Sequence, residues 1–112
     1  MTLNLFFILD KPGPCIDFKK TSVAETTIGL AWQTPADDGG REITHYIVQK
    51  RDTKQRSWGP VSKPEETECM AQGLIEGTTY QFQVAAENEV GVGPFVELPE
   101  PVTAKSPHGK YN

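Results

Sequence analysis

The sequence predicts an all-β fold, a seven-stranded antiparallel β-sandwich made of two sheets. Apolar and polar residues separate onto two faces from Tyr80 to Glu87, which is the pattern of a strand with one buried face. No window of about 11–18 residues shows the period of an amphipathic helix. Turn-forming residues recur roughly every 8–12 residues, a spacing typical of short strands that cross between two packed sheets.

The first two strands are short and bounded by turn formers. Residues 16–21 carry Phe18 as the inward anchor of the first strand. Because side chains alternate along a strand, residues 26–33 place three large apolar side chains on one face. These three are Ile28, Leu30 and Trp32.

The third strand is expected over residues 43–51, after a loop rich in turn formers. Its parity places Tyr46 and Val48 inward. Ile43 and Ile47 fall on the opposite parity, so either they are half exposed or the strand carries a bulge.

Three further strands complete the two sheets around the strand that begins at Tyr80. Residues 58–62 contain Pro60, which suits an edge position because proline has no N–H to donate to a neighbour. Residues 67–71 follow, and residues 98–105 are expected to close the sheet with Val102 inward.

The expected hydrophobic core is anchored by aromatic and large aliphatic residues. Trp32 buries the largest apolar surface and is expected to nucleate the core. Tyr80 fits a tyrosine corner, with its ring in the core and its hydroxyl bonded to the backbone near Leu74. The core set is Trp32, Tyr46, Leu74, Tyr80, Phe82 and Val84.

The two ends of the sequence are expected to lie outside the folded domain. The segment MTLNLFFIL lacks the cleavage features of a signal peptide and is too short to span a membrane. It is either the last strand of a preceding module or a leader. Two prolines stiffen the DKPGP linker that follows. We therefore expect a disordered leader and linker over residues 1–11, one domain over residues 12–105 and a tail over residues 106–112.

Size and charge narrow the class of protein. At 112 residues the chain has room for one core, and a net charge of −4 argues against nucleic-acid binding. Six of the eleven basic residues lie between Arg41 and Lys63, whereas residues 64–104 carry eight acidic residues and no basic one. This separation indicates either a plain solvated surface or a module with complementary charged faces.

The two cysteines, Cys15 and Cys69, cannot form a framework of several disulfides. A single bridge is conceivable, but Cys15 precedes the first clear strand and does not face Cys69 across the expected core. We favour two reduced thiols and a reducing compartment.

Several anchors follow one another in an order that resembles a known family. They are Pro14, Trp32, Tyr46, Leu74, Tyr80 and the turn from Asn88 through Gly91 and Gly93 to Pro94. Together they resemble the fibronectin type III domain, an immunoglobulin-like sandwich that would cover nearly the whole chain. Cys15, where a proline is usual, and Phe95 depart from the family pattern.

Two longer segments, TPADDGGREITHYIVQKRDTKQRSW and AAENEVGVGP, are similar to type III modules of the giant tandem-repeat proteins of the sarcomere, above all those of the A-band. The resemblance implies a non-catalytic module that spaces an array in the cytoplasm of striated muscle. Its implied partners are neighbouring immunoglobulin and type III modules, myosin and thick-filament proteins. The isolated module is expected to be monomeric. The parent proteins carry a kinase domain elsewhere, and none of it lies in this sequence.

The alternative is an adhesion or receptor module of an extracellular protein. Reduced cysteines and the absence of an Asn-x-Ser/Thr glycosylation site from the sequence count against it. Neither an Arg-Gly-Asp turn nor a Trp-Ser-x-Trp-Ser motif occurs.

Candidate catalytic or cofactor-binding residues do not group in the sequence. His45 is expected to be a solvent-facing strand residue rather than a general base. The pair Asp37 and Asp38 indicates an acidic turn, because a calcium loop needs more oxygen ligands at regular spacing. The Gly91-Val92-Gly93 segment lacks the helix and the lysine of a phosphate loop. We expect no enzyme activity, metal or cofactor.

The best candidate partner surface is a set of basic residues on the third strand and the turn after it: Lys50, Arg51, Lys54 and Arg56. They could meet an acidic coiled-coil surface with weak affinity that many modules sum. The alternative is that they only keep the module soluble and protect an exposed edge. Val90, Val92 and Phe95 form a second candidate, an apolar patch near one linker.

Overall fold

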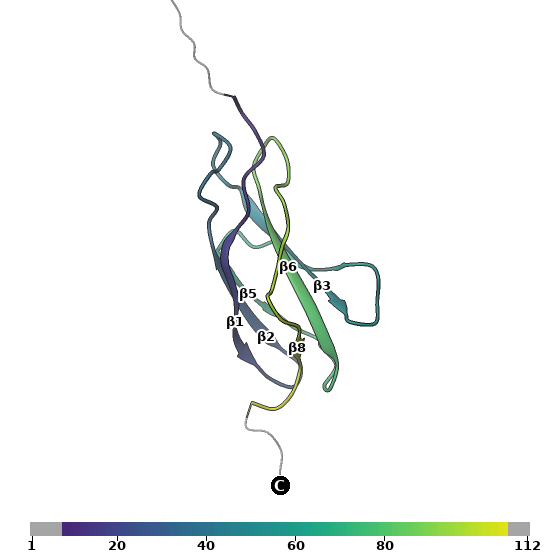
Figure 1. Ribbon diagram of the computed structural model, residues 1–112. Coiled ribbons are helices and arrows are strands. Elements are labelled where there is room, and N and C mark those ends of the chain that lie inside the picture. Colours follow the sequence, from purple (N-terminus) through teal and green to yellow (C-terminus); the bar gives the residue numbers. More distant parts are fainter. Residues whose placement is uncertain (1–7, 108–112) are drawn as a thin grey trace, which may run out of the picture.

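The computed structural model describes residues 8–107 of the chain, which fold into two packed antiparallel sheets without a helix in that range (Figure 1). One sheet has the order β1-β2-β5, and the other has the order β4-β3-β6-β7, with β8 also paired to β6. The strands are β1 (Ile16–Val23), β2 (Ile28–Gln33), β3 (His45–Asp52), β4 (Gly59–Ser62), β5 (Glu68–Ala71), β6 (Thr79–Glu87), β7 (Val96–Glu97) and β8 (Val102–Thr103). The predicted all-β sandwich is confirmed.

The last strand differs from the prediction, which placed one continuous strand over residues 98–105. Two short strands, β7 and β8, pair with β6 at different points instead, so residues 8–107 form eight strands rather than the expected seven. Pro99 and Pro101 lie between β7 and β8. Each proline removes a backbone donor and fixes φ, which explains why the strand cannot continue through them.

The third strand starts later than expected, at His45 rather than residue 43. Ile43 precedes it in a loop and packs against the core as a partly buried residue. Ile47 lies within the strand and is half-buried. The β3–β6 register is continuous from His45 to Asp52, so no bulge interrupts that pairing. The one irregularity of β3 is on its β4 side, between Val48 and Gln49.

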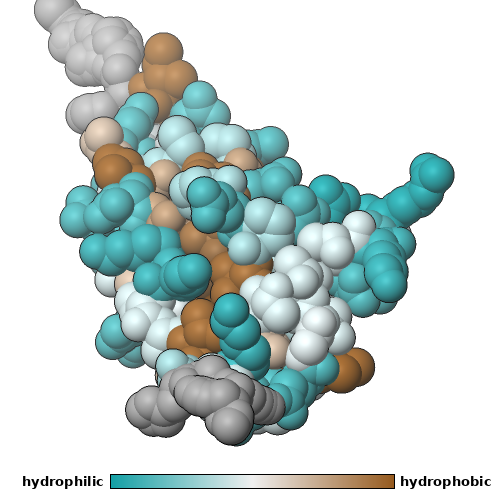
Figure 2. Space-filling model, turned by 60° about the horizontal axis from the view of Figure 1, so that its bottom comes forward, coloured by the Kyte–Doolittle hydropathy of each residue, from teal (hydrophilic) through white to brown (hydrophobic). Residues whose placement is uncertain are grey.

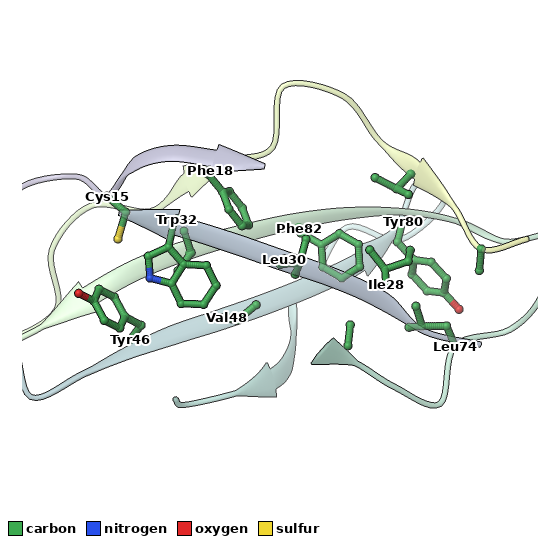
Figure 3. Close-up of a cluster of buried hydrophobic side chains, with 14 of the residues drawn as sticks. Cys15, Phe18, Ile28, Leu30, Trp32, Tyr46, Val48, Leu74, Tyr80 and Phe82 are labelled. Atoms are coloured by element: carbon green, nitrogen blue, oxygen red, sulfur yellow. The ribbon is translucent and has the colours of Figure 1, made fainter. Parts of the chain in front are cut away.

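Both sheets contribute to one hydrophobic core, and all six core residues expected from the sequence lie in it. The rings of Phe18, Trp32 and Tyr46 meet edge to face, with centroids 6.0 Å and 5.5 Å apart. Figure 3 shows these rings grouped at one end of the core, whereas Tyr80, Ile28 and Leu74 fill the other end. Edge-to-face packing is the arrangement that aromatic quadrupoles favour.

The second face of β6 is more buried than its polar sequence predicts. Gln83 is only 8% exposed and Ala85 is fully buried, although both lie opposite the core face of the strand. The reason is that β6 lies in the middle of its sheet between β3 and β7, so neighbouring side chains cover this face. Gln83 donates a hydrogen bond from Nε2 to Gln49 Oε1 at 2.7 Å.

Candidate protein-interaction surface

Polar side chains pair across β3 and β6 along the outer face of the larger sheet. His45 Nε2 lies 2.8 Å from Glu87 Oε1 at one end of the two strands. At the other end Arg51 Nε donates to Gln81 Oε1 at 2.7 Å. Directly opposed residues of an antiparallel pair bring their side chains close together, and the register pairs His45 with Glu87 and Arg51 with Gln81.

Arg51 is the residue that fixes the β3–β4 hairpin, residues 45–62. Besides Gln81, its guanidinium donates from one terminal nitrogen to the backbone carbonyl of Arg56 at 3.2 Å. Its central carbon lies 4.5 Å from the centroid of the Trp58 ring, a cation–π contact. Three contacts from one side chain tie the end of β3, the turn and the start of β4 together.

The turn of the hairpin is ordered through Asp52. Its Oδ1 accepts the backbone N–H of Lys54 at 2.9 Å, and its carbonyl accepts that of Gln55 at 2.8 Å. The side chains of Lys54 and Arg56 are exposed, and neither forms an ion pair within residues 8–107. The hairpin therefore holds two free cations on an ordered backbone, and Figure 2 shows a hydrophilic projection on this side of the molecule.

The four basic residues expected to form one surface do not lie on one face. Lys50 and Arg51 are neighbours on β3, so their side chains point to opposite sides of the sheet. Lys50 lines a cleft of about 470 Å³ with Trp58, Ile75 and Tyr80. Arg51 lies on the outer face, where its guanidinium already contacts Gln81, the backbone of Arg56 and the ring of Trp58. Lys54 and Arg56 remain as the exposed, unpaired part of the set.

The N-terminal linker is held in the structure by a second set of contacts, which centre on Asn88. Its amide nitrogen donates to the backbone carbonyls of Asp10 and Asp38, at 2.8 Å each. Its oxygen accepts the N–H groups of Val90 at 2.8 Å and Gly91 at 3.2 Å. Asn88 thus joins Asp10 to the loop after β6 and to the loop that contains Asp38. Asp10, expected in a disordered leader, is instead held in place; residues 1–7 of that leader lie outside the described residues.

A close approach of backbone to backbone completes this contact. A Cβ atom on Gly93 would collide with the carbonyl oxygen of Pro12, so only glycine fits there.

The apolar patch expected near this linker consists of Val90, Val92 and Phe95. Val90 is 42% exposed and Phe95 is 37% exposed, while Val92 is half-buried and forms a β-bridge with Glu87. The patch is therefore smaller than expected and lies beside the held linker.

The remaining candidate chemical groups have structural partners. Asp37 and Asp38 accept the N–H groups of Gly39 and Gly40 at 2.8 Å, as expected for an acidic turn. His45 is half-buried in its pair with Glu87 rather than facing solvent freely. Within residues 8–107 no three His, Cys, Asp or Glu side chains group to hold a metal ion, and no helix could cross a membrane.

The two cysteines are free, and burial shapes their acidity. Desolvation raises the pKa of the Cys15 thiol from 9.0 to about 11, against a smaller lowering by a backbone hydrogen bond. Burial also raises the pKa of Cys69, and it raises that of the Tyr46 hydroxyl. A raised pKa keeps a thiol protonated and unreactive near neutral pH.

Comparison with known proteins shows which family the sequence matches. The model of the fibronectin type III domain matches residues 10–102. Myosin-binding protein H of Gallus gallus is 38% identical over 86 residues, which are 76% of this chain and 16% of that protein. Cardiac-type myosin-binding protein C of Rattus norvegicus is 39% identical over 85 residues, 75% of this chain and 7% of that protein.

A solved structure shows the same likeness in three dimensions. A crystal structure of domains from titin matches with a TM-score of 0.82 and 37% identity, over 87% of this chain and 33% of that one. The chain thus spans a small part of the length of each of these proteins.

Proposed function

The chain belongs to the fibronectin type III family, and on that premise we propose that it is a non-catalytic link in a titin-like tandem array of the sarcomere. In this proposal it lies in the cytoplasm of striated muscle cells, in the A-band. It spaces its neighbouring modules and docks on myosin or associated thick-filament proteins. The names of the two myosin-binding relatives support the choice of partner.

The exposed cations of the β3–β4 hairpin carry the docking part of the proposal. Lys54 and Arg56 project from a turn that Arg51 and Asp52 hold in place. Because the turn is ordered before binding, little backbone entropy is lost when it meets a partner. An acidic surface on a filament is the complementary partner for such cations.

The affinity of one module is expected to be weak. Exposed charge pairs contribute only about 0–1 kcal/mol each, and salt screens them. An array multiplies such contacts, because once one module is bound its neighbours bind at a high effective concentration. The N-terminal linker, residues 10–13, supports a role in an array. Asn88 and Gly93 hold it against the domain and so limit the directions in which a preceding module can attach.

Co-sedimentation with purified myosin rods tests the proposal. We would compare the 112-residue chain, singly and as a tandem repeat, with its Lys54→Glu/Arg56→Glu variant. The control is Lys19→Glu/Lys20→Glu, which makes the same charge change on exposed positions of β1, in the other sheet. The tandem form should co-sediment, lose binding in the hairpin variant and keep it in the control. Equal binding by all three, or no binding at low salt, would contradict the proposal.

A further inference from the structure

Three hydroxyl groups follow two basic residues that lie within the three positions before them. A protein kinase with an acidic substrate groove selects serine or threonine by this pattern of charge. The three are Ser22 after Lys19 and Lys20, Thr53 after Lys50 and Arg51, and Ser57 after Lys54 and Arg56. Recognition also requires that the hydroxyl can leave the fold for the groove of the kinase and that its two cations are free. The structure separates the three residues on both requirements.

Ser22 and Thr53 lie in segments that the fold holds. Ser22 is part of β1 and pairs with Gly29 of β2, and its Oγ lies 2.6 Å from the position that a Cβ atom on Gly29 would take. Thr53 donates its backbone N–H to Thr79 O at 3.1 Å. One of the two cations before Thr53 is Arg51, which already makes the three contacts described above. Neither residue therefore meets both requirements.

Ser57 meets both of them. It is exposed and belongs to residues 53–58, which join β3 to β4 and are part of neither strand. Figure 1 shows this loop standing away from the two sheets. Lys54 and Arg56 are exposed and form no ion pair in the described part of the chain. Lifting the loop breaks only local bonds, such as the one from Arg51 to Arg56 O, and loops of this kind open at low free energy.

A phosphate on Ser57 would change the charge of the β3–β4 hairpin. Phosphoserine carries a charge of about −1.5 to −2 near neutral pH, which cancels the two positive charges of Lys54 and Arg56. Ser57 also lines the cleft of about 470 Å³ together with Lys50. Lys50 forms no ion pair among the described residues, so its ammonium group is a further partner for the phosphate. The modified hairpin would no longer attract an acidic surface.

We propose that Ser57 is a phosphorylation site for a protein kinase that selects basic residues ahead of serine, and that the phosphate switches off docking of the hairpin. The second part rests on the function proposed above, whereas the first does not. In the transfer, Ser57 Oγ attacks the γ-phosphorus of a nucleoside triphosphate and forms a bond to it. The bond from that phosphorus to the β–γ bridging oxygen breaks, and the nucleoside diphosphate leaves with the electron pair. The hydroxyl proton passes to a base of the kinase.

Phosphorylation of the intact 112-residue chain tests the site. The probe is the catalytic subunit of cAMP-dependent protein kinase with Mg²⁺ and ATP, and mass spectrometry of the digested product locates the phosphate. We expect one phosphoryl group per chain, on Ser57, and none in Ser57→Ala. Transfer mainly to Ser22 or Thr53, or no transfer to the folded chain, would overturn the proposal.

Two charge variants test whether the cations of the loop guide the kinase. Lys54→Gln/Arg56→Gln should slow the transfer to Ser57 by about tenfold or more, because it removes both free cations ahead of the hydroxyl. The matched control is Lys19→Gln/Lys20→Gln, which makes the same charge change on β1 and should leave the rate unchanged. Equal rates in the two variants would show that the pattern of charge does not select Ser57.

Co-sedimentation of the phosphorylated tandem repeat with myosin rods tests the switch. Phosphorylation should weaken binding about fivefold or more at low salt. Ser57→Ala, treated with the same kinase and ATP, should bind like the untreated wild type. Equal binding with and without the phosphate would refute the switch. Failure of the unmodified repeat to bind would refute the docking and the switch together, whereas the mass spectra alone decide whether Ser57 is the site.

Phosphorus-31 nuclear magnetic resonance tests the contact between the phosphate and Lys50 without myosin. Nearby cations favour the doubly charged phosphate, so its pKa should be lower in the folded chain than in the chain unfolded by urea. Lys50→Gln should remove part of this difference. The same phosphate pKa in the folded and unfolded chains would contradict the contact.

Discussion

The hydroxyl oxygen of Tyr80 accepts a hydrogen bond from the backbone N–H of Ile75 at 2.9 Å. This bond ties the first residues of β6 to the loop that leaves β5, and these two strands belong to different sheets. The ring of Tyr80 is buried in the core, so one side chain fixes both the packing and the crossover. The tyrosine corner predicted from the sequence is therefore confirmed.

Replacing Tyr80 with Phe removes only this bond and keeps the ring. We expect the free energy of unfolding to fall by roughly 1–3 kcal/mol, because the N–H of Ile75 loses its partner. Urea denaturation followed by tryptophan fluorescence measures this change. The control is Ile75→Ala, whose side chain is 68% exposed and whose N–H remains, and it should be nearly neutral. Equal losses in the two variants would mean that the hydrogen bond is not the cause.

Replacing Trp32 with Ala removes the central ring of the Phe18–Trp32–Tyr46 group. The expected loss of stability is about 3–5 kcal/mol, since the neighbouring sheets cannot close over a cavity of that size. Thermal or chemical unfolding followed by circular dichroism measures it. Trp32→Phe should cost less, because the indole Nε1 has no hydrogen-bond partner in the described part of the chain and only volume is lost. Unchanged stability of Trp32→Ala would contradict the observed packing.

The inward positions of the strands were predictable because alternation with period two is set by backbone geometry alone. Phe18, Trp32, Tyr46 and Phe82 illustrate this, since local sequence suffices to place each of them on the buried face. The break between β7 and β8 is indicated in the sequence by Pro99 and Pro101. The expectation of one strand over residues 98–105 neglects the two backbone donors that these prolines lack.

The candidate surface was harder to predict, because it depends on register between distant segments. Arg51 and Gln81 are separated by 30 positions, and Asn88 and Asp10 by 78. No local pattern reveals either pair. Parity could have separated Lys50 from Arg51, since neighbours on a strand point to opposite faces. Trp58 could have been noted as an aromatic partner for a nearby arginine, but its distance from Arg51 follows only from the fold.

Replacing Asn88 with Ala should free the N-terminal linker. The variant loses two donated and two accepted hydrogen bonds, and we expect faster hydrogen exchange at Val90 and Gly91 together with a loss of roughly 1–3 kcal/mol. Asn88→Asp is the matched control. It keeps oxygens that accept from Val90 and Gly91 but cannot donate to Asp10, so it should protect those two amides while loosening the linker. Identical exchange in wild type and Asn88→Ala would refute the role given to this side chain.

The Cys15 thiol should make stability depend on pH in alkaline solution. Its pKa is raised from 9.0 to about 11 in the folded chain, so the unfolded chain releases the thiol proton at a lower pH. This contribution to stability is complete below pH 9.0 and is lost as the pH rises toward about 11. Tyr46 acts in the same direction, because burial raises its pKa from 10.0. Cys15→Ala should therefore reduce, but not abolish, the loss of unfolding free energy between pH 9.0 and about 11. Urea denaturation at a series of pH values measures this loss, and the same pH dependence in Cys15→Ala and the wild type would contradict the burial of the thiol.

Mapping the face that is proposed to meet myosin tests the docking proposal most directly. A 15N-labelled chain would be titrated with a soluble fragment of the myosin rod at low salt, and the loss of signal would be followed for each amide. The account predicts broadening centred on residues 53–57 of the hairpin turn, absent in Lys54→Glu/Arg56→Glu. Broadening centred on β1, β2 and β5, or none at concentrations where a tandem repeat co-sediments, would contradict it.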